Sequence, residues 1–457
     1  MQSGAPAGPG RLSNFEVFAY AMPSIGIGTL FFLNSMLLMQ FASEVLKVAP
    51  AFVGSVLFAA RAWDAITDPL TGNLSDRTKS RWGRRRPWML VSAPLVLAMS
   101  VMLWSPPESL TNEQLELWIA VGVIGFYTAT TVFYVPYQSL GAELSPDHHE
   151  RSRIFGAQQA VQIVGTLIAA LTYTWVMVWA EDARAAARLM SIVLGGFMAG
   201  SIVFAVANVR ERAENVGRGG RSVLSAFGDV ARNRHAVPLY IAMIIDTLGS
   251  AALGAVAPFF TTHVLQAQEY FPFFLAFFVV PGLVFVPVGI RVSRRFGKLP
   301  TLRAGLCLQA VGFLLLSTLG AGDFWISCAF VTVLSIGSVT VQVLTPSVMS
   351  DAIDYDELQS GERKEGAYFA VRSFATKFGF GLGPLAVGWL LTMTGFEPGS
   401  PIGEDAIMGM RIMMGPVPAV GALIGASILM LSKLDEKTHA DIRAQLDARA
   451  EAAPAER

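Results

Sequence analysis

The sequence predicts an all-α membrane protein of twelve transmembrane helices, arranged as two pseudo-symmetric bundles of six. Three observations lead to this fold class. Hydrophobic residues make up 53% of the 457 residues and charged residues only 15%, with a mean hydropathy of +0.50, whereas soluble domains carry about 25% charged residues. Apolar stretches of about 20 residues, the length of a helical membrane span, recur along the chain. One long polar break divides these stretches into six and six.

The apolar stretches give the expected helices in order, since a helix satisfies its own backbone hydrogen bonds within lipid. We expect spans at 15–42, 49–74, 87–105, 114–141, 154–180, 187–208, 237–264, 270–292, 299–320, 323–350, 366–395 and 407–432. The domains expected from these spans are an N-terminal bundle with a cation site (1–208), a central loop (209–236), a C-terminal bundle (237–432) and a charged tail (433–457). We expect the tail to form a short solvated helix.

Positive charges fall on alternate loops and orient the spans. They are Arg77, Lys79, Arg81, Arg84, Arg85 and Arg86 after the second span, Arg151 and Arg153 after the fourth, Arg210, Arg212, Arg218, Arg221, Arg232 and Arg234 in the central loop, and Arg294, Arg295 and Lys298 after the eighth. Because Lys and Arg are retained on the cytoplasmic side, both termini and the central loop are expected in the cytoplasm. The expected location is the plasma (inner) membrane.

A weak internal repeat supports the division into halves. The segment SRWGRRRPWML after the second span resembles SRRFGKLPTLRAG after the eighth, and each is a basic loop with a glycine just before the next span. Secondary transporters are commonly built from such paired halves, with the substrate site between them at mid-membrane.

Asp64 and Asp68 lie inside the second apolar stretch. They are one helical turn apart, so both carboxylates lie on the same face of the helix. A charge at membrane depth is costly and is usually functional. Two carboxylates repel unless a cation, a proton or a basic partner neutralises them. The pair therefore predicts a cation site in a transporter; the alternative is an ion pair that only holds helices together.

Several longer motifs carry a resemblance to a known family. They are RAWDAITDP and GNLSDRTKSRWGRRRPWML around the second span, YVPYQSLGAEL in the fourth, SDAIDYDE after the tenth and RKEGAYFAVRSFATKFGFGLG in the eleventh. Together they resemble the glycoside–pentoside–hexuronide:cation symporters of the major facilitator superfamily. The animal sodium-coupled lysophospholipid symporters share the pattern of the second span. The resemblance implies alternating access by a monomer.

The resemblance assigns roles residue by residue. Cation binding falls to Asp64, Thr67, Asp68 and Thr131, with Lys377 supplying positive charge when the cation is absent. Sodium is the expected ion, with protons as the alternative. Gating falls to Asp76, Arg84, Arg85, Asp351 and Asp354, the arginines being expected to bond helix C-terminal carbonyls and acidic partners such as Asp351 or Asp354.

The expected substrate site departs from the family. Sugar-transporting members have a carboxylate, a tryptophan and an arginine where this chain has Tyr134, Gln138 and Gln159. The candidate substrate residues are Asn34, Tyr134, Gln138, Gln159, Gln162, Asp246 and Arg372. Arg372 is a candidate for binding an anionic group; the alternative is that Arg372 and Asp246 neutralise each other.

The expected function is symport of a glycoside, pentoside or hexuronide, with a lysophospholipid or other amphipathic anion as the alternative cargo. A formal net charge of zero gives no reason to expect a nucleic-acid partner. An enzyme is not expected, because the five histidines are scattered and no Gly-rich phosphate loop appears. A transport-inactive sensor would normally lose the cation site, which this chain keeps. No cofactor is expected apart from the coupling ion.

Overall fold

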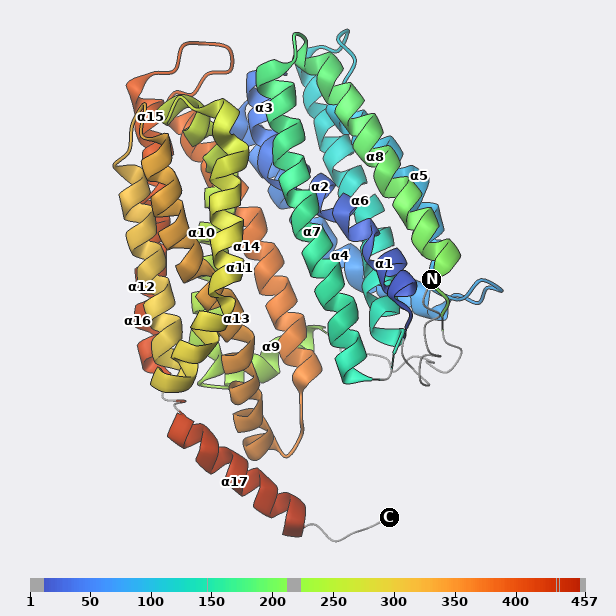
Figure 1. Cartoon of the computed structure of the whole chain (residues 1–457), viewed down its shortest axis with the longest axis vertical. Coiled ribbons are helices and arrows are strands. Elements are labelled where there is room, and N and C mark those ends of the chain that lie inside the picture. Colours follow the sequence, from blue (N-terminus) through green and yellow to red (C-terminus); the bar gives the residue numbers. More distant parts are fainter. Residues whose placement is uncertain (1–11, 146, 212–222, 433, 435, 453–457) are drawn as a thin grey trace, which may run out of the picture. The chain divides into compact units, whose positions relative to one another are not determined.

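The structure is a computed structural model that describes residues 12–145, 147–211, 223–432, 434 and 436–452 (Figure 1). The basic residues Arg212, Arg218 and Arg221 and the tail beyond 452 lie outside the described residues. Within them, eleven helices are long and apolar enough to cross a membrane. The other expected span is the 28-residue helix α4 (Pro50–Arg77), whose charged residues lower its hydropathy. The predicted all-helical membrane fold is confirmed.

The helices form two compact units, Met1–Arg218 with Gly388–Pro401, and Gly219–Val387 with Ile402–Arg457. The first contains α1 (Asn14–Ala21), α2 (Pro23–Phe32), the π-helical turn η1 (Leu33–Leu37), α3 (Leu38–Glu44), α4, α5 (Arg86–Trp104), α6 (Asn112–Glu143), α7 (His148–Thr174), the π-helical turn η2 (Trp175–Trp179) and α8 (Ala183–Asn208).

The second unit contains two short helices besides its spans. Its elements are α9 (Val223–Arg232), α10 (Ala236–Phe259), η3 (Phe260–Val264), η4 (Gln268–Tyr270), α11 (Phe271–Phe296), α12 (Lys298–Ser317), α13 (Phe324–Ser360), α14 (Glu365–Met393, whose last residues fall in the first unit), α15 (Glu404–Met414), α16 (Pro416–Ile428), η5 (Leu429–Leu431) and α17 (Glu436–Ala452).

Local sequence explains several helix starts in the first unit. Ser13 and Thr111 form capping boxes at the starts of α1 and α6, in which the hydroxyl accepts from the third residue of the helix. Asp147 and Asp182 cap α7 and α8 through their carboxylates. These caps satisfy backbone N–H groups that have no partner within the helix.

Close packing of α2 against α7 depends on glycine. A Cβ on Gly28 would lie 2.1 Å from the carbonyl oxygen of Gln162, and one on Gly165 would lie 2.1 Å from that of Ile25. The hydroxyl of Thr29 bonds the Gly165 carbonyl at 2.9 Å. Small residues allow membrane helices to approach this closely, so α2 and α7 form a rigid wall of the first unit.

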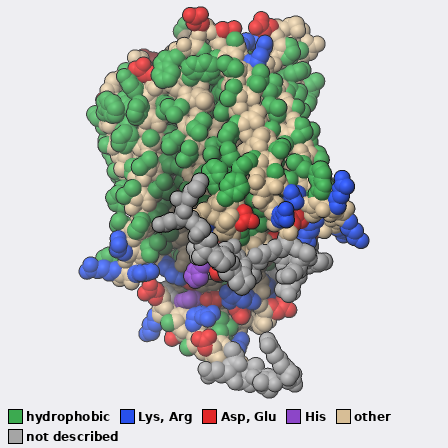
Figure 2. All heavy atoms as spheres, turned by 45° about the vertical axis from the view of Figure 1, so that its right-hand side comes forward, with side chains coloured by type: hydrophobic (Ala, Val, Ile, Leu, Met, Phe, Trp, Pro, Cys, Tyr) green, Lys and Arg blue, Asp and Glu red, His purple; other side chains and the backbone are tan. Residues whose placement is uncertain are grey.

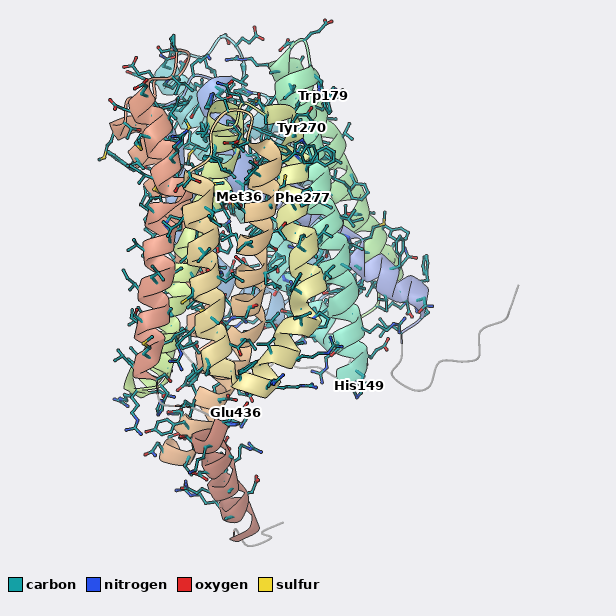
Figure 3. All side chains as sticks on the ribbon, turned by 60° about the vertical axis from the view of Figure 1, so that its left-hand side comes forward. Met36, His149, Trp179, Tyr270, Phe277 and Glu436 are labelled. Atoms are coloured by element: carbon teal, nitrogen blue, oxygen red, sulfur yellow. The ribbon has the colours of Figure 1, made fainter. Side chains whose placement is uncertain are left out.

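Apolar and aromatic side chains cover the outer faces of the helices. Figure 2 shows hydrophobic side chains over one face, with most of the visible Lys and Arg side chains toward the lower part of the view. His149 and Trp179 mark the two ends of one 31-residue span (Figure 3). Trp179 is 59% exposed, which suits an aromatic residue at a membrane interface.

Three expectations about non-membrane segments are corrected. The central loop contains the helix α9, whose Val230 is buried and whose Phe227 packs edge-to-face on Phe374. The tenth span continues to Ser360, ten residues beyond the predicted end, so the acidic motif SDAIDYDE is helical. The tail forms α17, but Ile442 is 4% exposed and the helix packs against α13. The tail is therefore docked rather than solvated.

His235, at the start of α10, gives the protein a predicted pH dependence. Burial lowers the pKa of His235, and the adjacent Arg234 guanidinium lowers it further. Arg234 donates to Nε2 of the ring at 3.3 Å, as a neutral imidazole allows. The unfolded chain therefore takes up a proton below about pH 6.5 that the folded chain does not.

We expect stability to be retained above this pH and to fall as the pH drops below it. Thermal unfolding in detergent, measured across this range for the parent and for His235→Gln, checks this. The variant should show a flatter profile, and equal slopes would contradict the assignment.

Candidate cation and substrate site

The two aspartates of α4 converge on one hydroxyl of α6. Thr131 Oγ1 lies 3.3 Å from Asp64 Oδ1 and 3.1 Å from Asp68 Oδ1. Asp64 and Thr131 are each 5% exposed, and Asp68 is half-buried. Nearer the start of both helices, the indole of Trp63, the residue before Asp64, donates to Thr128 Oγ1 at 2.9 Å. These contacts fix the register of α4 against α6.

The Thr131 hydroxyl has a single proton to donate. It can therefore serve only one of the two carboxylates at a time, although both are within reach. A cation between the carboxylates would instead use the hydroxyl oxygen as a ligand, which is the chemistry that hard cations prefer. Thr67 is 8% exposed; its hydroxyl donates to the Trp63 carbonyl at 3.1 Å and keeps an oxygen lone pair.

Within the described residues there is no group of three or more His, Cys, Asp or Glu side chains that could hold a metal ion. The oxygen donors of Asp64, Asp68 and Thr131, by contrast, suit a monovalent cation that is carried rather than a resident transition metal.

Arg61 is a member of this site that the sequence reasoning missed. Its guanidinium lies 3.6 Å from Asp64 Oδ2, donates to Ser35 Oγ at 3.1 Å and is 7% exposed. The Phe31 and Tyr127 rings face it, with centroids at 4.5 and 4.6 Å. The available signal was its position three residues before Asp64, which puts both on one helix face. Arg61 thus supplies a fixed positive charge inside the first unit.

The π-helical turn η1 shapes the wall next to Arg61. It interrupts the first span at Leu33–Leu37 and buries Asn34 and Ser35. Asn34 is 1% exposed, accepts from the Trp104 indole at 2.8 Å and donates to the Leu30 carbonyl at 2.8 Å. Asn34 therefore holds α5 to the first span; its role toward substrate stays a prediction.

The other polar candidates of the first unit lie on α6 and α7. Gln138 donates to the Tyr134 hydroxyl at 2.6 Å, and Tyr134 lies within electrostatic range of Asp68. Tyr134 and Thr131 are three residues apart on the same face of α6. The structure therefore places Tyr134 and Gln138 near the candidate cation site on α4 and α6. On α7, Gln159 is exposed and Gln162 is half-buried.

The candidates of the second unit do not pair with each other. Within the described residues no ion pair joins Asp246 of α10 to Arg372 of α14, so their mutual neutralisation is not observed. Asp246 Oδ1 is buried without a hydrogen bond among the described residues, and the Gln309 side chain lies near the same carboxyl group. Arg372 and Lys377 are both half-buried on α14, and Arg372 lies near the Tyr240 hydroxyl.

The predicted gating residues of the first unit form a compact ion-pair cluster. Arg85 bonds Asp76 and Ser75 on α4, and bonds Glu143 at the end of α6 at 3.2 Å. Arg84 bonds the same Glu143 oxygen at 2.9 Å. Sequence reasoning named Asp76, Arg84 and Arg85 but missed Glu143, which lies 58 residues from Arg85 in the chain.

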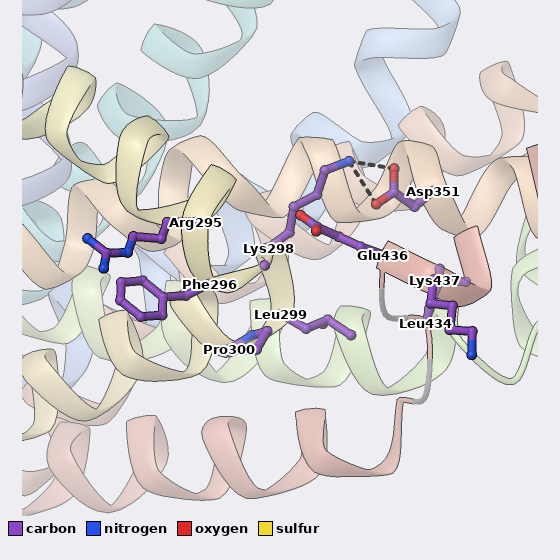
Figure 4. Close-up of a pocket in the computed structure, with 10 residues that line it drawn as sticks. Arg295, Phe296, Lys298, Leu299, Pro300, Asp351, Leu434, Glu436 and Lys437 are labelled. Carbon is purple, nitrogen blue, oxygen red and sulfur yellow. Dashed lines mark hydrogen bonds and ion pairs between the residues drawn. The ribbon is translucent and has the colours of Figure 1, made fainter. Parts of the chain in front are cut away.

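Asp351 and Asp354 have basic partners within their own unit, and their predicted pairing with Arg84 or Arg85 stays a prediction. Lys298 donates to both Asp351 oxygens, at 2.7 and 2.8 Å (Figure 4). Asp354 bonds Arg363 at 3.0 Å and His439 of α17 at 3.0 Å. Because these acids lie within α13 and not in a loop, they face basic groups that the sequence reasoning did not consider.

The weak repeat has a structural counterpart in these pairs. Gly83 and Gly297 both have positive φ angles, of 99° and 88°, just before the next span. In each half, a basic residue following this glycine pairs with an acid near the end of a later helix, namely Arg84 with Glu143 and Lys298 with Asp351. The two halves thus repeat one arrangement with different residues.

A multi-span helical fold in two units, with the Asp64 carboxylate buried inside a span, is typical of a membrane transporter. The comparison with protein families specifies the class. The profile of the MFS/sugar transport protein family matches residues 19–436, and the chain belongs to this family. The family match makes the chain a transporter and not an enzyme.

Relatives with established names cover nearly the whole chain. It is 26% identical to the isoprimeverose transporter of Lactiplantibacillus pentosus, over 92% of this chain and 89% of that protein. It is 22% identical to the glucuronide carrier protein homolog of Escherichia coli (strain K12), over 96% of each chain. It is 25% identical to the sodium-dependent lysophosphatidylcholine symporter 1 of Gallus gallus, over 93% of this chain and 88% of that protein.

Solved structures share the fold. A bacterial homolog of the human lysosomal transporter Spinster, in an inward-facing and unoccupied conformation, superposes with a TM-score of 0.66 at 14% identity, over 94% of this chain and 99% of that chain. The nucleoside transporter NupG superposes with a TM-score of 0.65 at 11% identity, over 92% of this chain and 100% of that chain. The resemblance to the family stated from the motifs is confirmed.

Proposed function

We propose that this transporter is a sodium-coupled symporter that moves a glycoside-like, sugar-like or hexuronide-like solute by alternating access. The observation that carries the proposal is the convergence of Asp64 and Asp68 on the single hydroxyl of Thr131. Two carboxylates near one donor proton are stabilised when a cation joins them. Protons are the second candidate ion, because paired carboxylates can also share a proton.

The charge balance of the site supports coupling. Arg61 is buried beside Asp64, with its guanidinium 3.6 Å from Asp64 Oδ2. We propose that Lys377 supplies a second positive charge when the ion is absent and gives way when it enters. Tyr134 and Gln138, next to Asp68, would then pass the effect of the bound ion to the solute.

The cargo is proposed from the relatives and from the polar groups of the site. Relatives named for isoprimeverose and glucuronide favour a sugar-like solute, which hydroxyl and amide groups such as Tyr134 and Gln138 can bind. In line with the positive-inside rule, we place both termini in the cytoplasm and the protein in the plasma (inner) membrane, as a monomer.

Arg372 favours a second candidate cargo. It is half-buried and makes no ion pair or hydrogen bond with another described residue. An arginine in this situation suits a phosphate or carboxylate. Relatives named as a lysophosphatidylcholine symporter and a sphingosine-1-phosphate transporter fit an amphipathic anion.

A ligand panel distinguishes the cargoes. The purified protein is heated in detergent with neutral glycosides, hexuronates or lysophospholipids, each with sodium or with choline as the counter-cation. We expect one sugar-like class to raise the unfolding temperature more with sodium than with choline, because ligands that bind only the folded state stabilise it. Stabilisation by lysophospholipids alone, lost in Arg372→Gln, would favour the second cargo. Equal stabilisation in sodium and choline would contradict coupling.

A further inference from the structure

Glu211, just past the end of α8, is bound to the start of a different helix. Its carboxylate accepts from the backbone N–H groups of three consecutive residues, Arg84, Arg85 and Arg86, each at 2.8 Å. These are the residues at which α5 begins. No side chain local to α5 caps it, and Pro87 has no N–H of its own. The helix start is therefore capped by a residue 125 positions away.

Helix α5 in turn donates hydrogen bonds to the end of α8. Arg86, the first residue of α5, donates through Nε and Nη2 to the carbonyl oxygen of Val206, at 3.0 and 2.5 Å. That carbonyl lies in the last turn of α8, which has no basic residue of its own. A carboxylate at a helix start and a guanidinium at a helix end both complement the helix dipole. Each helix thus supplies the terminal partner that the other lacks.

The contact between Glu211 and residues 84–86 requires glycine at position 83. The φ of 99° at Gly83 is unfavourable for other residues, and a Cβ there would lie 2.4 Å from Glu211 Cδ. The three guanidinium groups of residues 84–86 are balanced by three carboxylates, those of Asp76, Glu143 and Glu211. Of these, Glu143 binds only the arginine side chains, whereas Glu211 binds their backbone.

We infer that Glu211 is a positioning residue for the predicted gating cluster of Asp76, Arg84, Arg85 and Glu143 (hereafter the gate): its carboxylate holds the backbone of residues 84–86 so that Arg84 and Arg85 reach Glu143 and Asp76. The inference rests on the proposed alternating access for its effect on transport, but not for the contact itself. Because α8 leads into the central loop, the same contact ties the start of that loop to the gate. A displacement of the start of the central loop should therefore alter the position of the gate residues, and the reverse should also hold.

Hydrogen exchange of the peptide that spans residues 80–90, in the full-length protein, tests the contact without any assay of transport. Losing a helix cap costs about 0.5–2 kcal/mol, so Glu211→Gln should raise the exchange rate of these amides about two- to thirtyfold. Glu143→Gln is the matched control, since it removes the other carboxylate without touching a backbone N–H. Its exchange in this peptide should stay within about twofold of the parent.

Uptake into proteoliposomes then tests the role. Glu211→Gln should slow uptake severalfold, with an unfolding temperature close to that of the parent. Gly83→Ala should slow uptake in the parent more than in the Glu211→Gln background, because both changes disrupt one contact. Unchanged exchange in Glu211→Gln overturns the contact, and raised exchange with unchanged uptake overturns the role. If the parent itself shows no cation-driven uptake, the proposed function fails while the exchange result still stands.

Discussion

Replacing Asp64 or Asp68 by asparagine is expected to abolish cation-dependent uptake. Asparagine preserves the size of the side chain but removes the negative charge that attracts the ion. The hydroxyl of Thr131, at 3.3 and 3.1 Å from the two carboxylates, can then no longer complete an anionic set of ligands. The coupling between ion and solute, commonly about 5- to 150-fold in affinity, should disappear in each variant. Solute uptake into proteoliposomes under an imposed sodium gradient measures this.

Glu113→Gln is the matched control for these variants. Glu113 is an exposed acid at the start of α6, the helix that carries Thr131. The control removes the same charge from the same unit at a distance from the site, so uptake should equal that of the parent. Sodium-dependent uptake that persists in both aspartate variants would show that the ion binds elsewhere.

Replacing Arg61 by alanine is expected to be one of the most destabilising single changes in the first unit. The guanidinium is 7% exposed and its partner Asp64 is 5% exposed, so the substitution removes a buried positive charge 3.6 Å from a buried carboxylate. Breaking such a pair costs about 3–5 kcal/mol. It also removes the cation–π contacts with Phe31 and Tyr127. Thermal unfolding in detergent measures the loss.

Two further variants isolate the charge effect. The double variant Arg61→Ala/Asp64→Asn should regain part of the lost stability, because it removes the buried carboxylate together with the guanidinium beside it. Arg188→Ala, which truncates an exposed arginine of α8, should change the free energy of unfolding by less than about 0.5 kcal/mol. If Arg61→Ala unfolds at the same temperature as Arg188→Ala, Arg61 does not neutralise Asp64.

The fold could be predicted largely from the sequence, because membrane spans are set by local composition. A run of apolar residues must be helical in lipid whatever its neighbours, and the predicted limits agree with the helices to within a few residues in most cases. The predicted end of the tenth span was wrong, because α13 continues beyond the apolar stretch as a polar helix to Ser360. The helix α9 was not predicted, because the central loop is polar and basic on average and this average hides a short amphipathic helix within it.

The site was only partly predictable, since it depends on contacts between helices. Asp64 and Asp68 stand out in an apolar run, and their closeness to Thr131 followed from the family motif. Arg61 lies on the same helix yet was passed over, because a single arginine in a span also fits packing. Glu143 lies within the motif YVPYQSLGAEL, but nothing in that motif identifies its partners, and Glu211 lies in none of the motifs. Their roles arise only when the fold brings helix ends together.

The most direct test of cation coupling is a reciprocal binding measurement on the purified parent protein. Once the panel has identified a cargo, its dissociation constant is titrated at zero and at saturating sodium. The dissociation constant of sodium is then titrated without and with saturating cargo. Linkage requires both affinities to rise by the same factor, which we expect to be at least about fivefold and to be lost in Asp64→Asn and Asp68→Asn. A factor of one in the parent, with cargo and sodium binding independently, would contradict the sodium-coupled mechanism.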